Sequence, residues 1–238
     1  MISSLLLIAS LALAPAGLYN QGNKYYAQKD YPNAIQSYQQ ALQGGAEPQV
    51  LYNLGNAYFK AGQLGRAVIC YGRARFLTPR DQDISTNLTF ARSYRVDKNL
   101  FIAAPMARFF SLCFHYFSLT EAALLAALLF VLGAAAISAY IVYRKIFLTY
   151  VAGLAWLLFL PFFITQQVWQ GEKNSNPAVI VAAEVNTLSG PGQDYKQILL
   201  LHDGTEVNIR EQRGEYLLIQ LPGGAGGWVK KDAVEKIF

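Results

Sequence analysis

The sequence predicts a multidomain membrane protein with an α-helical repeat region, two transmembrane helices and a C-terminal all-β barrel. Three observations predict this architecture: self-similarity at a fixed interval in the first part of the chain, two long apolar stretches after it, and a final series of short apolar runs separated by turn residues. Of the 238 residues, 53% are hydrophobic and 15% are charged. Soluble proteins carry about a quarter charged residues. The apolar excess lies in residues 100–169, which indicates insertion into a membrane.

The first residues resemble a secretory signal peptide. Residues 2–14 form an apolar stretch that is too short for an ordinary membrane span of about 20 residues. Small residues at Ala14 and Ala16 predict a signal peptide over residues 1–16, with cleavage after Ala16. No Lys or Arg precedes the apolar run, so an uncleaved anchor or an early start of the first repeat helix stays open as an alternative.

The next part of the chain contains two copies of one pattern. Six residues of the first copy match six of the second at a constant interval: Leu18, Gly22, Tyr25, Ala34, Tyr38 and Ala41 correspond to Leu51, Gly55, Tyr58, Ala67, Tyr71 and Ala74. This pattern, completed in the second copy by Leu54 and Pro79, resembles the tetratricopeptide repeat (TPR), a pair of antiparallel helices. Two copies need a further element to cover their core. Ile84, Leu88 and Ala91 predict a capping helix over 83–98, so the TPR region spans 17–98.

The first helix of each repeat carries the candidate binding residues. TPR helices of this kind line a concave face, and we expect a peptide-binding groove there, lined by Tyr19, Asn20, Asn23, Tyr26, Tyr52, Asn53, Asn56 and Phe59. An Asn side chain offers both a donor and an acceptor to a peptide backbone. The alternative is that these Asn residues are solvated or belong to the repeat consensus. The first repeat lacks the basic residues of carboxylate-clamp TPRs, so a C-terminal carboxylate is not the expected ligand.

Residues 119–169 predict a transmembrane hairpin. Residues 119–143 and 146–164 are apolar and long enough to cross a bilayer as helices, and Arg144-Lys145 interrupts them. Two basic residues in the connecting loop favour a cytoplasmic loop. We therefore expect a bacterial inner-membrane protein with its N- and C-terminal domains in the periplasm. The aromatic-rich segment 99–118 is interpreted as an interfacial connector, or alternatively as a connector packed against the TPR cap.

The C-terminal part changes to β patterning after a polar linker at 170–177. Five runs separated by turn residues predict a small closed barrel over 178–238, with strands at 178–183, 198–201, 205–211, 216–221 and 227–230. Ser189-Gly190-Pro191, Asp203-Gly204-Thr205 and Gly227-Trp228-Val229 resemble bacterial SH3 domains, although Thr187 and Leu188 replace the usual Val-Arg. That resemblance implies a binder of wall peptides or proteins. Its candidate ligand platform is Tyr195, Tyr216 and Trp228, with a core role for the Trp as the alternative.

No catalytic, metal-binding or cofactor-binding pattern is present in the sequence. The chain has two His and two Cys residues without metal-ligand spacing, and Cys113 and His115 point to different faces of a helix. No motif for a Ser hydrolase, zinc protease or phosphate-binding loop occurs. The net charge of +5 is scattered, which favours weak attraction to anionic lipid over nucleic-acid binding. We therefore expect a non-enzymatic protein that binds other proteins and membrane lipid.

The order of the parts resembles a known family. The TPR unit ends in Leu77-Thr78-Pro79, Asn87-Leu88, Ala91-Arg92 and Val96-Asp97-Lys98, and the chain ends near Glu235-Lys236-Ile237. With the hairpin and the SH3-like region, this arrangement is similar to the BatE proteins of the Bacteroides-aerotolerance gene cluster. The resemblance implies an envelope scaffold that assembles with membrane proteins carrying von Willebrand A domains and with a MoxR-type ATPase. The alternative is an accessory protein of the cell wall or of wall hydrolases, which binds peptidoglycan through the SH3-like domain.

Overall fold

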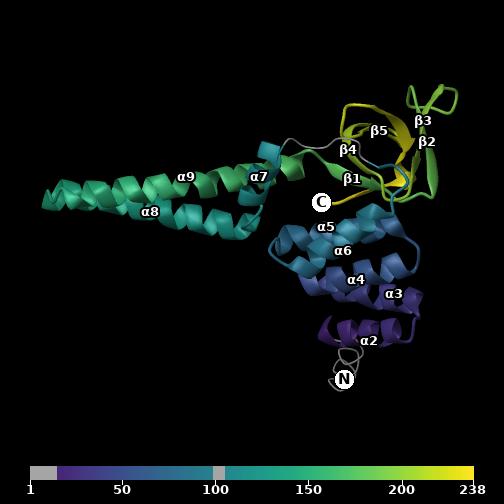
Figure 1. Cartoon of the computed structure of the whole chain (residues 1–238), viewed down its shortest axis with the longest axis horizontal. Coiled ribbons are helices and arrows are strands. Elements are labelled where there is room, and N and C mark those ends of the chain that lie inside the picture. Colours follow the sequence, from purple (N-terminus) through teal and green to yellow (C-terminus); the bar gives the residue numbers. More distant parts are fainter. Residues whose placement is uncertain (1–14, 99–104) are drawn as a thin grey trace, which may run out of the picture. The chain divides into compact units, whose positions relative to one another are not determined.

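The computed structural model describes residues 15–98 and 105–238, which fall into two compact units (Figure 1). The first unit contains the N-terminal helices and the C-terminal sheet, and the second contains residues 76–80 and the apolar helices. Residues 1–14 of the expected signal peptide and residues 99–104 of the expected connector lie outside the described residues. The signal peptide therefore stays a prediction.

The N-terminal part consists of two helical hairpins and one further helix. The first hairpin pairs α2 (Pro15–Ala27) with α3 (Tyr31–Ala41), followed by the short 3-10 helix η1 (Leu42–Gly44). The second hairpin pairs α4 (Pro48–Lys60) with α5 (Leu64–Leu77). The single helix α6 (Gln82–Ser93) is the expected capping helix, and its face with Ile84, Leu88 and Ala91 is buried. The Asp81 side chain caps the N-terminus of α6, where it accepts hydrogen bonds from the backbone amides of residues 83 and 84.

Glycine and tyrosine residues set the close approach within each hairpin. A Cβ atom at Gly22 would lie 2.5 Å from the ring of Tyr38, and one at Gly55 would lie 2.6 Å from the ring of Tyr71. Both rings are almost completely buried. The repeat spacing therefore reflects the same packing arrangement in both hairpins. A glycine on the first helix leaves room for an aromatic ring from the second helix.

The C-terminal part is an antiparallel sheet of seven strands. They are β1 (Pro177–Ile180), β2 (Glu184–Leu188), β3 (Gln197–His202), β4 (Glu206–Arg213), β5 (Tyr216–Gln220), β6 (Gly226–Lys230) and β7 (Val234–Lys236), with the 3-10 helix η2 (Lys231–Ala233) before β7. The strand order is β3-β2-β6-β5-β4-β1-β7. Strands β2 and β7 were not predicted, because β2 alternates weakly and β7 has only three residues.

The expected closed barrel is not formed, since within residues 177–236 the two end strands β3 and β7 do not pair. The β2–β6 junction is held by a single residue pair, Leu188 and Trp228. Strand β7 lies instead beside helix α5. There the Arg73 guanidinium donates hydrogen bonds to the carbonyl oxygens of Lys236 at 2.8 Å and Ile237 at 2.6 Å. The edge that a barrel would use for closure is thus covered by a helix.

The second unit is dominated by two long helices, α8 (Leu119–Tyr143) and α9 (Phe147–Asn174), preceded by α7 (Pro105–Phe114). By length and composition both α8 and α9 could cross a membrane, with mean hydropathies of 2.4 and 2.1. They pack together through small residues, and a Cβ atom at Gly133 would collide with the Trp156 ring. Helix α9 continues to Asn174, so most of the segment expected to be a linker at 170–177 is helical.

Polar contacts stabilise the end of this second unit at which α8 begins. Ser118 and Glu121 form a capping box at the start of α8, and Arg80 pairs with Glu121. The indole N–H of Trp169 donates to the carbonyl oxygen of Phe117 at 2.8 Å. Glu121, the charged residue within the first apolar stretch, therefore has a structural role at a helix terminus.

Candidate peptide-binding groove

A cavity lies between the first helices of the two hairpins, α2 and α4, where the sequence predicted a peptide-binding groove. The cavity has a volume of about 150 Å³ and is lined by Asn23, Tyr26, Tyr38, Asn53 and Asn56. Four of these five were predicted groove residues, and Tyr38 comes from the second helix of the first hairpin. We call the surface formed by α2, α4 and α6 around this cavity the groove.

The first rung of a side-chain ladder crosses the groove between α2 and α4. The Tyr38 hydroxyl donates to Oδ1 of Asn23 at 2.7 Å. The Asn53 amide donates to the same Oδ1 at 3.1 Å and to the Tyr19 hydroxyl at 2.9 Å. Both acceptor positions of the Asn23 carbonyl and both amide hydrogens of Asn53 are therefore used within the protein.

A second rung repeats this arrangement between α4 and α6. The Tyr71 hydroxyl donates to Oδ1 of Asn56 at 2.7 Å. The Asn87 amide donates to that Oδ1 at 2.9 Å and to the Tyr52 hydroxyl at 3.0 Å. Asn87 was not among the predicted site residues. Its place on the predicted capping helix, one residue more than the repeat interval after Asn53, was the signal that could have assigned it to the groove.

The buried tyrosines fix the orientation of the amides. Burial raises the pKa of Tyr38 and of Tyr71, so both phenols stay protonated and donate at ordinary pH. Because the Oδ1 atoms of Asn23 and Asn56 accept these bonds, their Nδ2 groups are the ones left without a partner within residues 15–98 and 105–238. On Asn53 and Asn87 the Nδ2 group is used, and Oδ1 is left without a partner in the same part of the chain.

The groups not used in these bonds are consequently a donor, an acceptor, a donor and an acceptor for Asn23, Asn53, Asn56 and Asn87, and the first three of these residues line the cavity. An extended peptide presents alternating C=O and N–H groups along its backbone. The ladder is therefore complementary in chemistry to a main chain, whatever its side chains.

The remaining predicted groove residues have different surroundings. Asn20 is exposed on α2, in the position that Asn53 occupies on α4. The rings of Tyr19 and Tyr52 lie 6.1 Å from those of Tyr38 and Tyr71 respectively, and their hydroxyls serve the ladder as acceptors. Phe59 contacts two aromatic side chains of the α6 segment.

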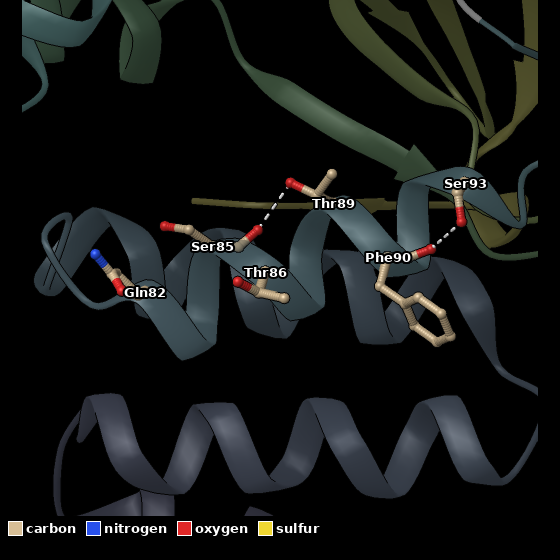
Figure 2. A pocket seen from close by; sticks show the side chains of 6 residues that line it. All are labelled: Gln82, Ser85, Thr86, Thr89, Phe90 and Ser93. Carbon is tan, nitrogen blue, oxygen red and sulfur yellow. Dashed lines mark hydrogen bonds between the residues drawn. The ribbon is translucent and has the colours of Figure 1, made fainter.

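Helix α6 carries a second, more open depression beside the groove. Its volume is about 590 Å³, and it is lined by Gln82, Ser85, Thr86, Thr89, Phe90 and Ser93 (Figure 2). These residues recur at intervals of one helical turn, so they follow one face of α6 along its length. This face corresponds to the one that receives the second helix in each of the two hairpins.

The three candidate residues of the β region have different surroundings. Trp228 is 8% exposed and therefore buried, with the Arg213 guanidinium 5.3 Å from its ring. Tyr195 is exposed and packs on the turn at Gly190 and Gly192. Tyr216 lines a cavity of about 300 Å³, together with residues that include Lys230 and Asp232.

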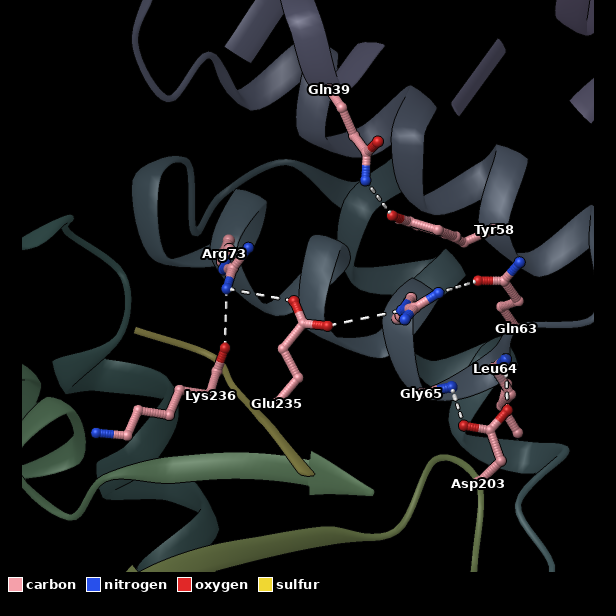
Figure 3. A network of polar contacts seen from close by, with 10 residues as sticks. Gln39, Tyr58, Gln63, Leu64, Gly65, Arg73, Asp203, Glu235 and Lys236 are labelled. Atoms are coloured by element: carbon pink, nitrogen blue, oxygen red, sulfur yellow. Dashed lines mark hydrogen bonds and ion pairs between the residues drawn. The ribbon is translucent and has the colours of Figure 1, made fainter. Parts of the chain in front are cut away.

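The sheet is fastened to the helical repeats by polar contacts that the sequence did not predict. The Asp203 carboxylate accepts hydrogen bonds from the amides of Leu64 and Gly65, both at 2.9 Å, and so caps α5 (Figure 3). Burial raises the pKa of Asp203 despite these donors. The Glu235 carboxylate lies 3.8 Å from the Arg73 guanidinium (Figure 3). It also lies 3.7 Å from the Arg66 guanidinium.

A second set of contacts joins the sheet to the end of α6. The Glu206 carboxylate accepts hydrogen bonds from Arg92 and Arg95, each with a shortest distance of 2.6 Å. Asp97 accepts from the His202 amide and from the Thr205 hydroxyl, both at 2.7 Å. These hydrogen bonds outweigh burial and lower the pKa of Asp97.

Apolar side chains complete this contact. Val179 and Ile237 belong to the same buried cluster as the repeat residues Val68 and Ile69, and Phe238 packs against that cluster. The sheet therefore closes the core of the helical repeats, and the groove lies on the α2, α4 and α6 side.

Comparison with known families identifies the repeats. Residues 15–43 and residues 48–81 each match the family model of the tetratricopeptide repeat. The chain therefore carries two tetratricopeptide repeats, which correspond to the two hairpins described above. Helix α6 lies outside both matches. No curated protein sequence matches the chain.

Proposed function

We propose that the protein is a membrane-anchored scaffold that holds an extended segment of a partner protein in its groove. Tetratricopeptide repeats point to protein–protein interaction, and the observation that carries the proposal is the ladder of four Asn side chains with alternating free donors and acceptors. The ladder binds backbone, so the partner is recognised first by its extended conformation. The proposal includes no catalytic step.

Changing the free donors of the ladder tests this function. In the double variant Asn23→Asp and Asn56→Asp, the retained oxygen still accepts from Tyr38 and Tyr71, while the outward amide becomes a carboxylate that repels peptide carbonyl groups. We expect at least a tenfold loss of partner recovered with the protein from detergent-solubilised membranes, measured by quantitative mass spectrometry.

The double variant Gln36→Glu and Gln40→Glu serves as its control, because it introduces the same charge change on exposed positions of α3. It is expected to recover the partner at the wild-type level. If both double variants recover equal amounts of partner and keep their helical content, the groove does not bind the partner and the proposed function is contradicted.

The anchoring part of the proposal rests on the second unit. Helices α8 and α9 are long and apolar, and the connecting residues Arg144 and Lys145 favour a cytoplasmic loop. We propose a location in the bacterial inner membrane with both the repeats and the sheet in the periplasm. By resemblance to the BatE proteins, the proposed partners are membrane proteins with von Willebrand A domains, in an envelope complex linked to oxygen tolerance or stress.

A reporter fused after Phe238 tests this orientation. Alkaline phosphatase, which folds to its active form only outside the cytoplasm, is expected to be active there, and green fluorescent protein fused at the same place after Sec-dependent insertion is expected to be dark. The reverse pair of results would place the sheet in the cytoplasm and would contradict the proposed orientation.

A second candidate function is attachment to the cell wall through the sheet. The resemblance to bacterial SH3 domains supports it, together with the cavity of about 300 Å³ that Tyr216 lines. Co-sedimentation with purified peptidoglycan measures this binding. The Tyr216→Ala variant should stay in the supernatant if this function holds, and absence of wild-type protein from the pellet would exclude it.

A further inference from the structure

Three aromatic side chains, one partly buried and two exposed, form a cluster at the end of the groove. The ring of Phe59 lies 5.6 Å from that of Phe90 and 5.3 Å from that of Tyr94, and the rings of Phe90 and Tyr94 are 5.0 Å apart. Phe90 is 50% exposed and Tyr94 is 59% exposed. We call these three residues the aromatic shelf. Clustered exposed aromatic groups mark interaction sites more often than single exposed apolar residues do.

The aromatic shelf continues the ladder in position. Phe90 follows Asn56 by the same interval that separates Asn87 from Asn53. Phe90 also lies one helical turn beyond Asn87, where the side chains of α6 are neighbours. A peptide aligned on Asn87 therefore meets the aromatic shelf within the next residues of its chain.

The surroundings of the aromatic shelf favour hydrocarbon. Hydroxyl groups beside Phe90 are turned toward the carbonyl oxygens of their own helix: Thr89 donates to Ser85 at 2.8 Å and Ser93 donates to Phe90 at 2.6 Å (Figure 2). Their hydrogens are thereby occupied, and carbon atoms form most of the surface of the neighbouring depression.

We propose that the aromatic shelf selects an apolar side chain, aliphatic or proline, at one fixed position of the peptide that the ladder holds. This inference rests on the proposed function of the groove. The ladder supplies contacts to the main chain that do not depend on sequence, and the aromatic shelf adds the sequence preference. Burial of one such side chain strengthens binding by about tenfold or more.

Selection from a random peptide library tests the inference. The probe is a displayed library of short random peptides, and the target is the full chain in detergent. The wild-type protein is expected to enrich peptides with aliphatic residues or proline at a single aligned position. The double variant Phe90→Ser and Tyr94→Ser is expected to lose that preference and to bind individual selected peptides about tenfold more weakly. Both side chains are half exposed or more, so the fold is retained, and circular dichroism checks this.

The outcomes separate the inference from the proposed function. Absence of any enriched peptide with the wild-type protein would overturn both. Enrichment that the Asn23→Asp and Asn56→Asp variant abolishes, but without a position that prefers apolar residues, would overturn the aromatic shelf alone. The inference would also be overturned if the Phe90→Ser and Tyr94→Ser variant kept the same preference. It would be overturned as well if the substitutions changed the oligomeric state of the protein and left its peptide preference unaltered.

Discussion

Replacing Ile237 by Asp is expected to destabilise the second tetratricopeptide repeat, although Ile237 lies far from residues 48–81 in the sequence. Ile237 is 8% exposed and belongs to the buried cluster that also contains Val68 and Ile69. The substitution removes an apolar side chain from this cluster and leaves an unpaired carboxylate, at a cost of about 3–5 kcal/mol. Hydrogen exchange of residues 64–77, followed by mass spectrometry, should then be faster by a factor of about 100 or more.

Ile198→Asp is the matched control. Ile198 lies in the same sheet but is 49% exposed. An exposed substitution changes stability by about 0.5 kcal/mol or less, so exchange in residues 64–77 should stay at the wild-type rate. Unchanged exchange in the Ile237→Asp variant would show that the sheet does not complete the core of the repeats.

Replacing Glu206 by Ala is expected to detach the sheet from the end of α6. The Glu206 carboxylate is the partner of both Arg92 and Arg95, and the Arg95 side chain is only 10% exposed. Removal of one member of a largely buried ion pair leaves the other charges without compensation, which costs about 3 kcal/mol. The expected result is faster hydrogen exchange across residues 82–98, with little change in α2 and α3.

Glu211→Ala provides the comparison for this second variant. Glu211 lies on the same strand, and it pairs with Arg213, whose side chain is 61% exposed. Exposed ion pairs contribute about 0–1 kcal/mol, so residues 82–98 should keep their wild-type exchange rates. If the Glu206→Ala and Glu211→Ala variants behave alike, the contact between Glu206 and the arginines is not what holds the sheet.

Local periodicity made much of the fold predictable. The Gly and Tyr residues that pack within each hairpin recur at a constant interval because the same steric problem is solved twice. The long apolar helices were predictable for a similar reason, since a helix of bilayer length leaves a continuous signal. Four predicted groove residues line one cavity because the first helix of each repeat presents equivalent positions on one face.

The contacts between the repeats and the sheet could not be predicted. Asp97, Asp203 and Glu206 are ordinary charged residues in the sequence, and their partners lie 105–139 residues away along the chain. No periodic signal marks such pairs. The predicted barrel closure was wrong for the same reason: the short strand β7 pairs with β1 and is covered by Arg73, a residue of the repeats.

The repeat pattern could not predict the roles of Asn87 and Phe90. Helix α6 has no second helix, so it lacks the Gly and Tyr positions that identify a repeat, and neither residue was assigned to the groove. The spacing from Asn53 was the one signal in the sequence, and the structure relates Asn87 to Asn53 through their equivalent hydrogen bonds.

Photo-crosslinking in intact membranes tests most directly whether a partner segment lies in the groove. A photoreactive phenylalanine analogue is placed at Tyr26, which lines the cavity, or at Gln40, which is exposed on α3. The account predicts one discrete adduct of higher mass from position 26, none from position 40, and loss of the adduct in the Asn23→Asp and Asn56→Asp background. Adducts of equal yield from both positions, or no adduct from position 26, would contradict it.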